Sequence, residues 1–134
     1  MGLYNVKNIK INNNADPANN RVGNLVLIGS ESHSGYNGAI IMPASFVCDT
    51  LTSADCIIDF SYCDNVKFMC LGIGAKTPVT DGNCGVGKGL TGFDAKFISI
   101  STCSLDSLGY GIYGEYVALF NITNNSISKC NVGV

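Results

Sequence analysis

Aromatic side chains beside glycines form the first candidate site in this sequence, at Tyr110, Tyr113 and Tyr116. A tyrosine ring offers a flat apolar face and a hydroxyl group, and both serve in stacking on sugars and in contacts with proteins. The alternative interpretation is that these rings are half-buried strand residues around a bulge. We take the three tyrosines as the candidate ligand- or partner-binding residues.

Residues 82–89 read Gly-Asn-Cys-Gly-Val-Gly-Lys-Gly and satisfy the pattern G-x-x-x-x-G-K, with Gly where Ser or Thr is usual. The segment resembles the phosphate loop of adenylate kinases, and this resemblance implies nucleotide binding. A working phosphate loop joins a buried strand to the N-terminus of a helix. The preceding strand is expected to end near Ile73, and Leu90–Asp94 has no helical pattern. We therefore favour a connection between two strands, within a long loop over Gly74–Asp94.

The chain offers few groups for catalysis. His33 is the only histidine and stands between serines in a Ser/Gly loop, whereas the members of a catalytic triad come from separate elements. A zinc site with several histidines is excluded. A glycosidase needs two facing carboxylates, and Asp59 is a weak candidate for one of them. We predict a protein that is not an enzyme, with no catalytic residue, no metal site and no cofactor.

Seven cysteines occur without the C-x-x-C or Cys/His spacing of a zinc site. The favoured interpretation is that they are free thiols that act as small hydrophobic residues in a reducing compartment. A partial set of disulfides involving Cys48, Cys84, Cys103 or Cys130 is the alternative. Cys56, Cys63 and Cys70 are not expected to bond to one another, because the hairpin described next separates them.

The segment Cys56–Ile73 shows the clearest structural pattern. It reads as two strands joined by a two-residue turn at Asp64-Asn65, residue types that tolerate positive φ. In this register one face is apolar, and a slip of one residue would scatter the apolar set over both faces. We therefore predict an antiparallel hairpin that buries four side chains together: Ile58, Phe60, Met69 and Leu71.

Other segments also favour strands. Short apolar runs occur at Asn24–Gly29 and at Ala39–Met42, where Pro43 ends the strand or confines it to an edge, and further strands are expected at Ala95–Cys103 and Glu115–Thr123. No convincing helical periodicity and no internal repeat is visible. The sequence thus predicts an all-β protein: a single domain over residues 1–134, folded as an antiparallel β-sandwich or jelly roll of about 8–9 short strands.

Charged residues make up only 13% of the chain, about half the usual share, and the net charge is −2. Basic residues are spread singly, which argues against binding to nucleic acid or to an anionic membrane. The N-terminal residues show no secretory signal, and the apolar runs are too short to cross a bilayer. We therefore expect a protein made in a cytosol without a signal peptide.

A weakly charged surface suits packing against other protein molecules, because little repulsion keeps the copies apart. The favoured functional hypothesis is therefore a self-associating structural subunit that forms a homo-oligomer, such as a small virus or phage capsid-decoration or tail component. The alternative is a β-sandwich module that binds a carbohydrate or protein ligand through the tyrosines.

Overall fold

The computed structural model describes residues 3–4, 6–29, 40–42, 45–48, 51–75 and 86–134, and these residues form fourteen strands. The described residues contain no helix that is long and apolar enough to span a membrane. The strands belong to three sheets, which we name A, B and C.

In each sheet, neighbouring strands come from successive turns of the chain. Sheet A contains β1 (Leu3–Tyr4), β5 (Ser45–Cys48), β8 (Gly72–Ala75), β11 (Ser104–Asp106) and β14 (Ser126–Ser128). Sheet B contains β12 (Tyr110–Glu115), β9 (Lys88–Phe93), β6 (Cys56–Asp59) and β2 (Ile9–Lys10). Sheet C contains β13 (Ala118–Thr123), β10 (Lys96–Ser101), β7 (Cys63–Met69), β3 (Val22–Gly29) and β4 (Ile40–Met42).

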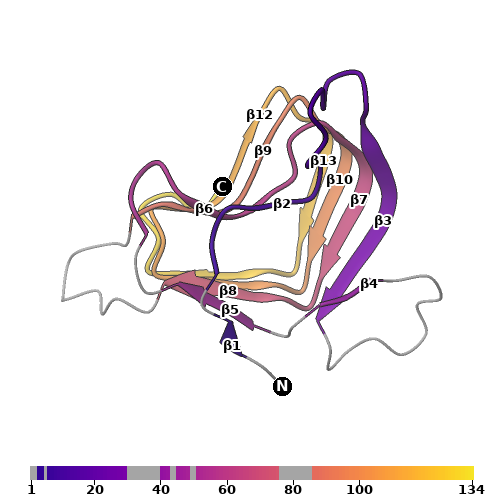
Figure 1. Ribbon diagram of the computed structural model, residues 1–134. Coiled ribbons are helices and arrows are strands. Elements are labelled where there is room, and N and C mark those ends of the chain that lie inside the picture. The colour runs from indigo at the N-terminus through magenta and orange to yellow at the C-terminus, as the bar shows by residue number, and fades with distance from the viewer. Residues whose placement is uncertain (1–2, 5, 30–39, 43–44, 49–50, 76–85) are drawn as a thin grey trace.

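The chain visits sheets B, C and A in rotation, so it winds as a parallel β-solenoid (Figure 1). Each of the four coils contributes one strand to every sheet, and β1 and β4 are additional strands at the edges of sheets A and C. Coil 1 consists of β2, β3 and β5, coil 2 of β6, β7 and β8, coil 3 of β9, β10 and β11, and coil 4 of β12, β13 and β14. Every pairing between the described strands is parallel.

The predicted antiparallel sandwich or jelly roll is therefore wrong, although the all-β class is confirmed. The hairpin over Cys56–Ile73 is wrong for the same reason: β6, β7 and β8 follow one another around a single coil and lie in three different sheets. Asn65 does adopt a positive φ of 57°, but it lies inside β7, which continues to Met69. A single left-handed residue bends this strand without reversing it.

A repeat of 22 residues relates coils 3 and 4, where Lys96 pairs with Ala118 and Ser104 pairs with Ser126. Between coils 2 and 3 the offset is 32, as Asp64 pairs with Lys96. The additional ten residues correspond to 76–85. The expectation of no internal repeat is thus also wrong. The repeat is hidden in the sequence because the number of residues between successive coils differs.

The core lies inside the solenoid, where side chains of the same type stack from coil to coil. Ile58, Leu90 and Ile112 are register neighbours in sheet B, and all three are fully buried. Similar columns in sheets C and A are Val66–Ile98–Phe120, Phe68–Ile100–Ile122 and Ile73–Leu105–Ile127. Ile58, Phe60 and Leu71 are buried as predicted, whereas Met69 is half-buried.

Left-handed backbone conformations recur at the same point of successive coils, with φ between 45° and 60°. They bend the chain at the corners, so their alignment keeps the coils in register. The four columns are Tyr62–Asp94–Tyr116, Asn24–Asn65–Phe97–Leu119, Cys70–Thr102–Asn124 and Ser107–Lys129.

Cys48, Cys56, Cys63, Cys70 and Cys103 are free thiols. Cys56, Cys63 and Cys70 do not bond to one another, as predicted, but the hairpin register used for that argument is wrong. Their separation follows instead from the winding, since Cys56 belongs to sheet B and Cys63 to sheet C, and Cys70 lies at the next corner. Cys84 lies outside the described residues.

Candidate functional site

The three candidate tyrosines lie on β12 or directly after it. Tyr110 and Tyr113 belong to the strand, and Tyr116 follows its last residue, Glu115, at the corner between sheets B and C. Tyr116 is 76% exposed and Tyr110 is 38% exposed, while Tyr113 is half-buried. The structure thus places all three at the surface, in two neighbouring groups.

The first group is a chain of aromatic rings along the corner between sheets B and C. The ring centroids of Tyr62 and Phe93 are 5.7 Å apart, and those of Phe93 and Tyr116 are 5.5 Å apart. Both pairs meet edge to face, which is the favoured arrangement of aromatic rings. Coils 2, 3 and 4 each contribute one ring to this chain.

The same corner carries two further apolar side chains, Phe97 and Leu119, which are 55% and 67% exposed. They occupy the left-handed column that holds Asn24 and Asn65 in coils 1 and 2. In those coils the amide of Asn65 donates a hydrogen bond of 2.8 Å to the side chain of Asn24. The column is therefore polar in coils 1 and 2 and apolar in coils 3 and 4. We call Tyr62, Phe93, Phe97, Tyr116 and Leu119 the corner patch.

The left-handed backbone conformation of Phe97 and Leu119 has a cost in conformational energy. Left-handed φ suits glycine and asparagine, whereas it is rare for bulky residues and costs about 1–2 kcal/mol at each position. Neither side chain recovers this energy by burial, because both are exposed. Left-handed residues recur at every corner, but these two are bulky, apolar and exposed, so we take this corner as a candidate binding surface.

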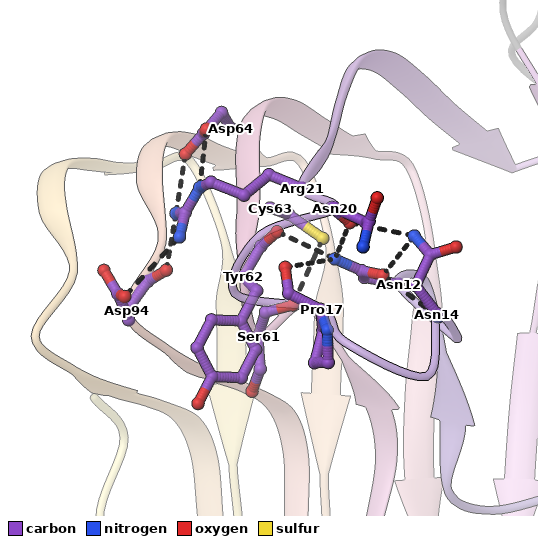
Figure 2. A network of polar contacts seen from close by, with 10 residues as sticks. All are labelled: Asn12, Asn14, Pro17, Asn20, Arg21, Ser61, Tyr62, Cys63, Asp64 and Asp94. Carbon is purple, nitrogen blue, oxygen red and sulfur yellow. Dashed lines mark hydrogen bonds and ion pairs between the residues drawn. The ribbon is translucent and has the colours of Figure 1, made fainter.

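Arg21 fixes the corner from outside the solenoid (Figure 2). Its guanidinium makes two hydrogen bonds to the carboxylate of Asp64, of 2.7 and 2.8 Å. It also donates to the backbone oxygen of Asp94, at 2.6 Å, and lies 3.5 Å from the carboxylate of that residue. These hydrogen bonds lower the pKa of Asp64 and raise that of Arg21. One side chain thus connects coils 1, 2 and 3 beside the corner patch.

The buried side chain of Asn12 holds the loop between β2 and β3 in place. The amide of Asn12 donates to the backbone oxygens of Pro17, Asn20 and Tyr62, at 3.3, 3.0 and 3.1 Å. Its oxygen accepts hydrogen bonds from the backbone and side-chain nitrogens of Asn14 (Figure 2). Because every polar atom of Asn12 is satisfied, we interpret this network as structural support for the corner.

The second aromatic group faces outward from sheet B and consists of Tyr110, Tyr113 and Lys88, which we call the tyrosine site. The two ring centroids are 5.2 Å apart, with an interplanar angle of 78°. The ammonium nitrogen of Lys88 lies 5.2 Å from the centroid of the Tyr113 ring, within the range of a cation–π contact. Thr91 pairs with Tyr113 in the neighbouring strand.

A shallow trough of about 180 Å³ lies over sheet A. Gly72 and Gly74 are among the residues that line it, and Ser104 and Asp106 line it on the coil 3 side. The Asp106 carboxylate accepts hydrogen bonds from two serines, which lower its pKa. Asp106 supplies the single carboxylate among the lining residues, and none of them is aromatic or cationic. We therefore do not treat the trough as the main site.

The remaining sequence motifs carry no chemistry in the part of the chain that the structure describes. His33 and residues 82–85 lie outside that part. Lys88 begins strand β9, so a strand and not a helix follows the glycines, as expected for a connection between strands. The long loop predicted over Gly74–Asp94 is too long, because β8 extends to Ala75 and β9 occupies Lys88–Phe93.

No group of three potential metal ligands occurs among the described residues. The carboxylate of Asp59, the weak candidate for glycosidase chemistry, accepts two hydrogen bonds from the backbone nitrogen and the hydroxyl of Ser61. It therefore terminates β6 locally, in the manner of a turn-forming aspartate.

Sequence reasoning singled out Tyr110, Tyr113 and Tyr116, which stay candidates, but it did not single out Tyr62, Phe93, Phe97 or Leu119. Phe97 and Leu119 lie inside segments read as ordinary strands, where alternation alone gives no sign of a left-handed residue. Alignment of the coils would have revealed them, because Asn24 and Asn65 occupy the same column and favour that conformation.

Comparisons with protein-family models, with curated proteins and with solved structures find no match for this chain.

Proposed function

We propose that this β-solenoid is a self-associating structural subunit and that its corner patch binds the corner patch of a second copy. The observation that carries the proposal is the change within one column, from Asn24 and Asn65 to the exposed Phe97 and Leu119. The chain contains residues that suit this backbone in coils 1 and 2. In coils 3 and 4 it replaces them with apolar residues that gain energy only when they are covered.

The charge of the molecule supports a second copy as the partner. With 13% charged residues and a net charge of −2, two copies repel each other weakly. Around the patch the exposed Lys96 and Glu115 carry opposite signs. A surface with both signs can match itself across a two-fold axis, since one copy's lysine meets the other copy's glutamate.

The shape of the patch supports the same arrangement. It follows a corner built from stacked coils and spans coils 2, 3 and 4, whose neighbouring strands are about 4.8 Å apart. Two such corners could lie side by side and bury about 800 Å² on each copy, the usual area for a stable contact. Such a subunit fits a virus or phage particle, as a capsid-decoration or tail component, where many copies of one weakly charged surface pack together.

The test is the double variant Phe97→Asn/Leu119→Asn, which copies the residues of coils 1 and 2 into coils 3 and 4. We expect wild-type protein to sediment as a dimer or larger oligomer at high micromolar concentration, and the variant as a monomer. The variant should keep its fold, because asparagine relieves the left-handed strain. Loss of association therefore cannot be attributed to unfolding, which circular dichroism would detect.

Val86→Asn is the matched control, because Val86 is a similarly exposed apolar residue, 52% accessible, that lies outside the corner patch. This control should associate like the wild type. A wild-type protein that remains monomeric at high micromolar concentration would contradict the proposal. An equal loss of association in Val86→Asn would show that the contact lies elsewhere.

A further inference from the structure

The tyrosine site faces solvent on sheet B and is separate from the corner patch. Strands β9 and β12 present Lys88, Tyr110 and Tyr113 on one side of the sheet. Tyr113 pairs in register with Thr91, and Thr91 pairs with Asp59 of coil 2. The outer face of sheet B therefore combines aromatic rings with a row of hydroxyl and charged groups.

The arrangement of the two rings leaves aromatic surface accessible. Because the rings of Tyr110 and Tyr113 meet at 78°, they do not cover each other face to face. Lys88 lies over Tyr113, while 38% of Tyr110 remains exposed. Tyr110 thus offers a ring for stacking beside the ammonium group of Lys88.

The charge of Lys88 is not neutralised by an ion pair among the described residues. The three ion pairs of the described part of the chain involve Lys7 and Arg21 and not Lys88. Two carboxylates of coil 2 lie near this part of the sheet: that of Asp59 accepts hydrogen bonds from Ser61, and that of Asp55 pairs with Lys7. A cation held against an aromatic ring, with no carboxylate bound to it, attracts an anionic group of a ligand.

The ligand that matches this combination is a sugar acid. A pyranose ring has an apolar C–H face that stacks on tyrosine, hydroxyl groups that hydrogen-bond to side chains such as Thr91, and in uronic acids a carboxylate for Lys88. A protein partner would instead require a larger apolar contact area, which the corner patch offers.

We propose that the outer face of sheet B over coils 3 and 4 binds acidic oligosaccharides. Tyr110 stacks on a sugar ring, Lys88 pairs with a uronate carboxylate, and the hydroxyl groups of Thr91 and Tyr113 hydrogen-bond to the sugar. None of these four residues belongs to the corner patch, so sugar binding and self-association can be tested with separate variants.

The experiment is a titration of the full chain with an oligogalacturonate, followed by isothermal calorimetry and by two-dimensional NMR of backbone amides. We expect saturable binding, with shifts centred on β9 and β12 and an affinity that falls as salt rises. A neutral oligosaccharide of the same length should bind at least several-fold more weakly. Sodium acetate should not displace the oligogalacturonate at equal carboxylate concentration.

Two variants test the roles of the side chains. Tyr110→Ala should abolish most of the binding, and Lys88→Met should weaken acidic oligosaccharides by up to about fivefold while leaving the neutral one unchanged. Lys10→Met is the matched control, because Lys10 is an exposed lysine on the same sheet in coil 1. It should bind like the wild type.

Several results would overturn this proposal. They are the absence of saturable binding at millimolar oligogalacturonate, equal affinity for the neutral oligosaccharide, equal competition by acetate, and equal losses in Lys88→Met and Lys10→Met. The variant Phe97→Asn/Leu119→Asn should keep its affinity, so a failure of self-association and a failure of sugar binding are distinguishable.

Discussion

Phe60 fills the interior of the solenoid across more than one coil. Its ring lies 5.8 Å from that of Phe68 and 5.9 Å from that of Phe120, measured between centroids. Gly92 makes this possible, because a Cβ atom at that position would come within 2.0 Å of the Phe60 ring. The large and the small residue therefore occupy one column of the core and depend on each other.

Phe60→Ala should lower the free energy of unfolding by about 3–5 kcal/mol, because it leaves a cavity that stacked backbone cannot close. Urea denaturation followed by circular dichroism measures this loss. Phe93→Ala is the control, since Phe93 is 39% exposed and its truncation should cost much less. A loss below about 1 kcal/mol for Phe60→Ala would contradict the observed packing.

Burial of thiols makes stability depend on alkaline pH. Desolvation raises the pKa of Cys56 to about 11 and that of Cys63 to about 12, above the value of about 8.5 in an unfolded chain. The unfolded state therefore loses these protons first, so the contribution is present below about pH 8.5 and declines as pH rises. We expect the urea midpoint to fall between pH 8 and 10.

Cys63→Ala tests the origin of this decline, because Ala95 occupies the corresponding buried position in coil 3. The variant should fold and lose less stability between pH 8 and 10 than the wild type. An identical decline in the variant would show that the Cys63 thiol does not contribute.

At the scale of elements, Arg21 joins the segment before β3 to the corners that follow β6 and β9. Its contacts with Asp64 and Asp94 are charge-assisted, and such hydrogen bonds are stronger than neutral ones. The corner patch lies beside them, so this tie also positions the proposed contact surface.

Asp64→Asn should cost about 1–2 kcal/mol at pH 7, because it removes the charge that the Arg21 guanidinium binds. The hydrogen bonds with Arg21 lower the pKa of Asp64, so its contribution is present above the unfolded value of about 3.9 and is lost as pH falls. Urea denaturation of wild type and variant should therefore converge below that pH.

The existence of strands could be predicted from the sequence, but their pairing could not. The expected strands at Asn24–Gly29 and Ala95–Cys103 correspond to β3 and β10, and the strand at Ala39–Met42 is β4, at the edge of sheet C. Alternation of apolar and polar residues has a period of two in parallel and antiparallel sheets alike, so it does not reveal direction. Asn65 also favoured the wrong prediction of a hairpin. Residues that tolerate positive φ are typical of hairpin turns, but here such a residue bends a strand of the solenoid.

At the scale of the whole molecule, the candidate site depends on winding that brings distant residues together. Tyr62, Phe93 and Tyr116 are far apart in the sequence, and only the stacking of coils 2, 3 and 4 makes them neighbours. The tyrosines of β12 could be proposed from the sequence because they are close to one another in it. The rest of the corner patch could not be found without the register.

Self-association should make thermal stability depend on protein concentration, because the bound partner stabilises the folded state by mass action. We expect the Tm of the wild type to rise as its concentration is raised from low to high micromolar. The Tm of Phe97→Asn/Leu119→Asn should stay constant over the same range. Differential scanning calorimetry tests this, and a wild-type Tm that does not change would contradict the proposed assembly.

The unequal spacing of the coils has a consequence for engineering. Coils 2 and 3 keep their pairings in all three sheets although ten more residues separate them than separate coils 3 and 4. The segment between Ala75 and Val86 can therefore differ in length without a shift in register. A foreign peptide spliced there would be carried at a defined place on the scaffold, and an assembly of many subunits would display it as a regular array.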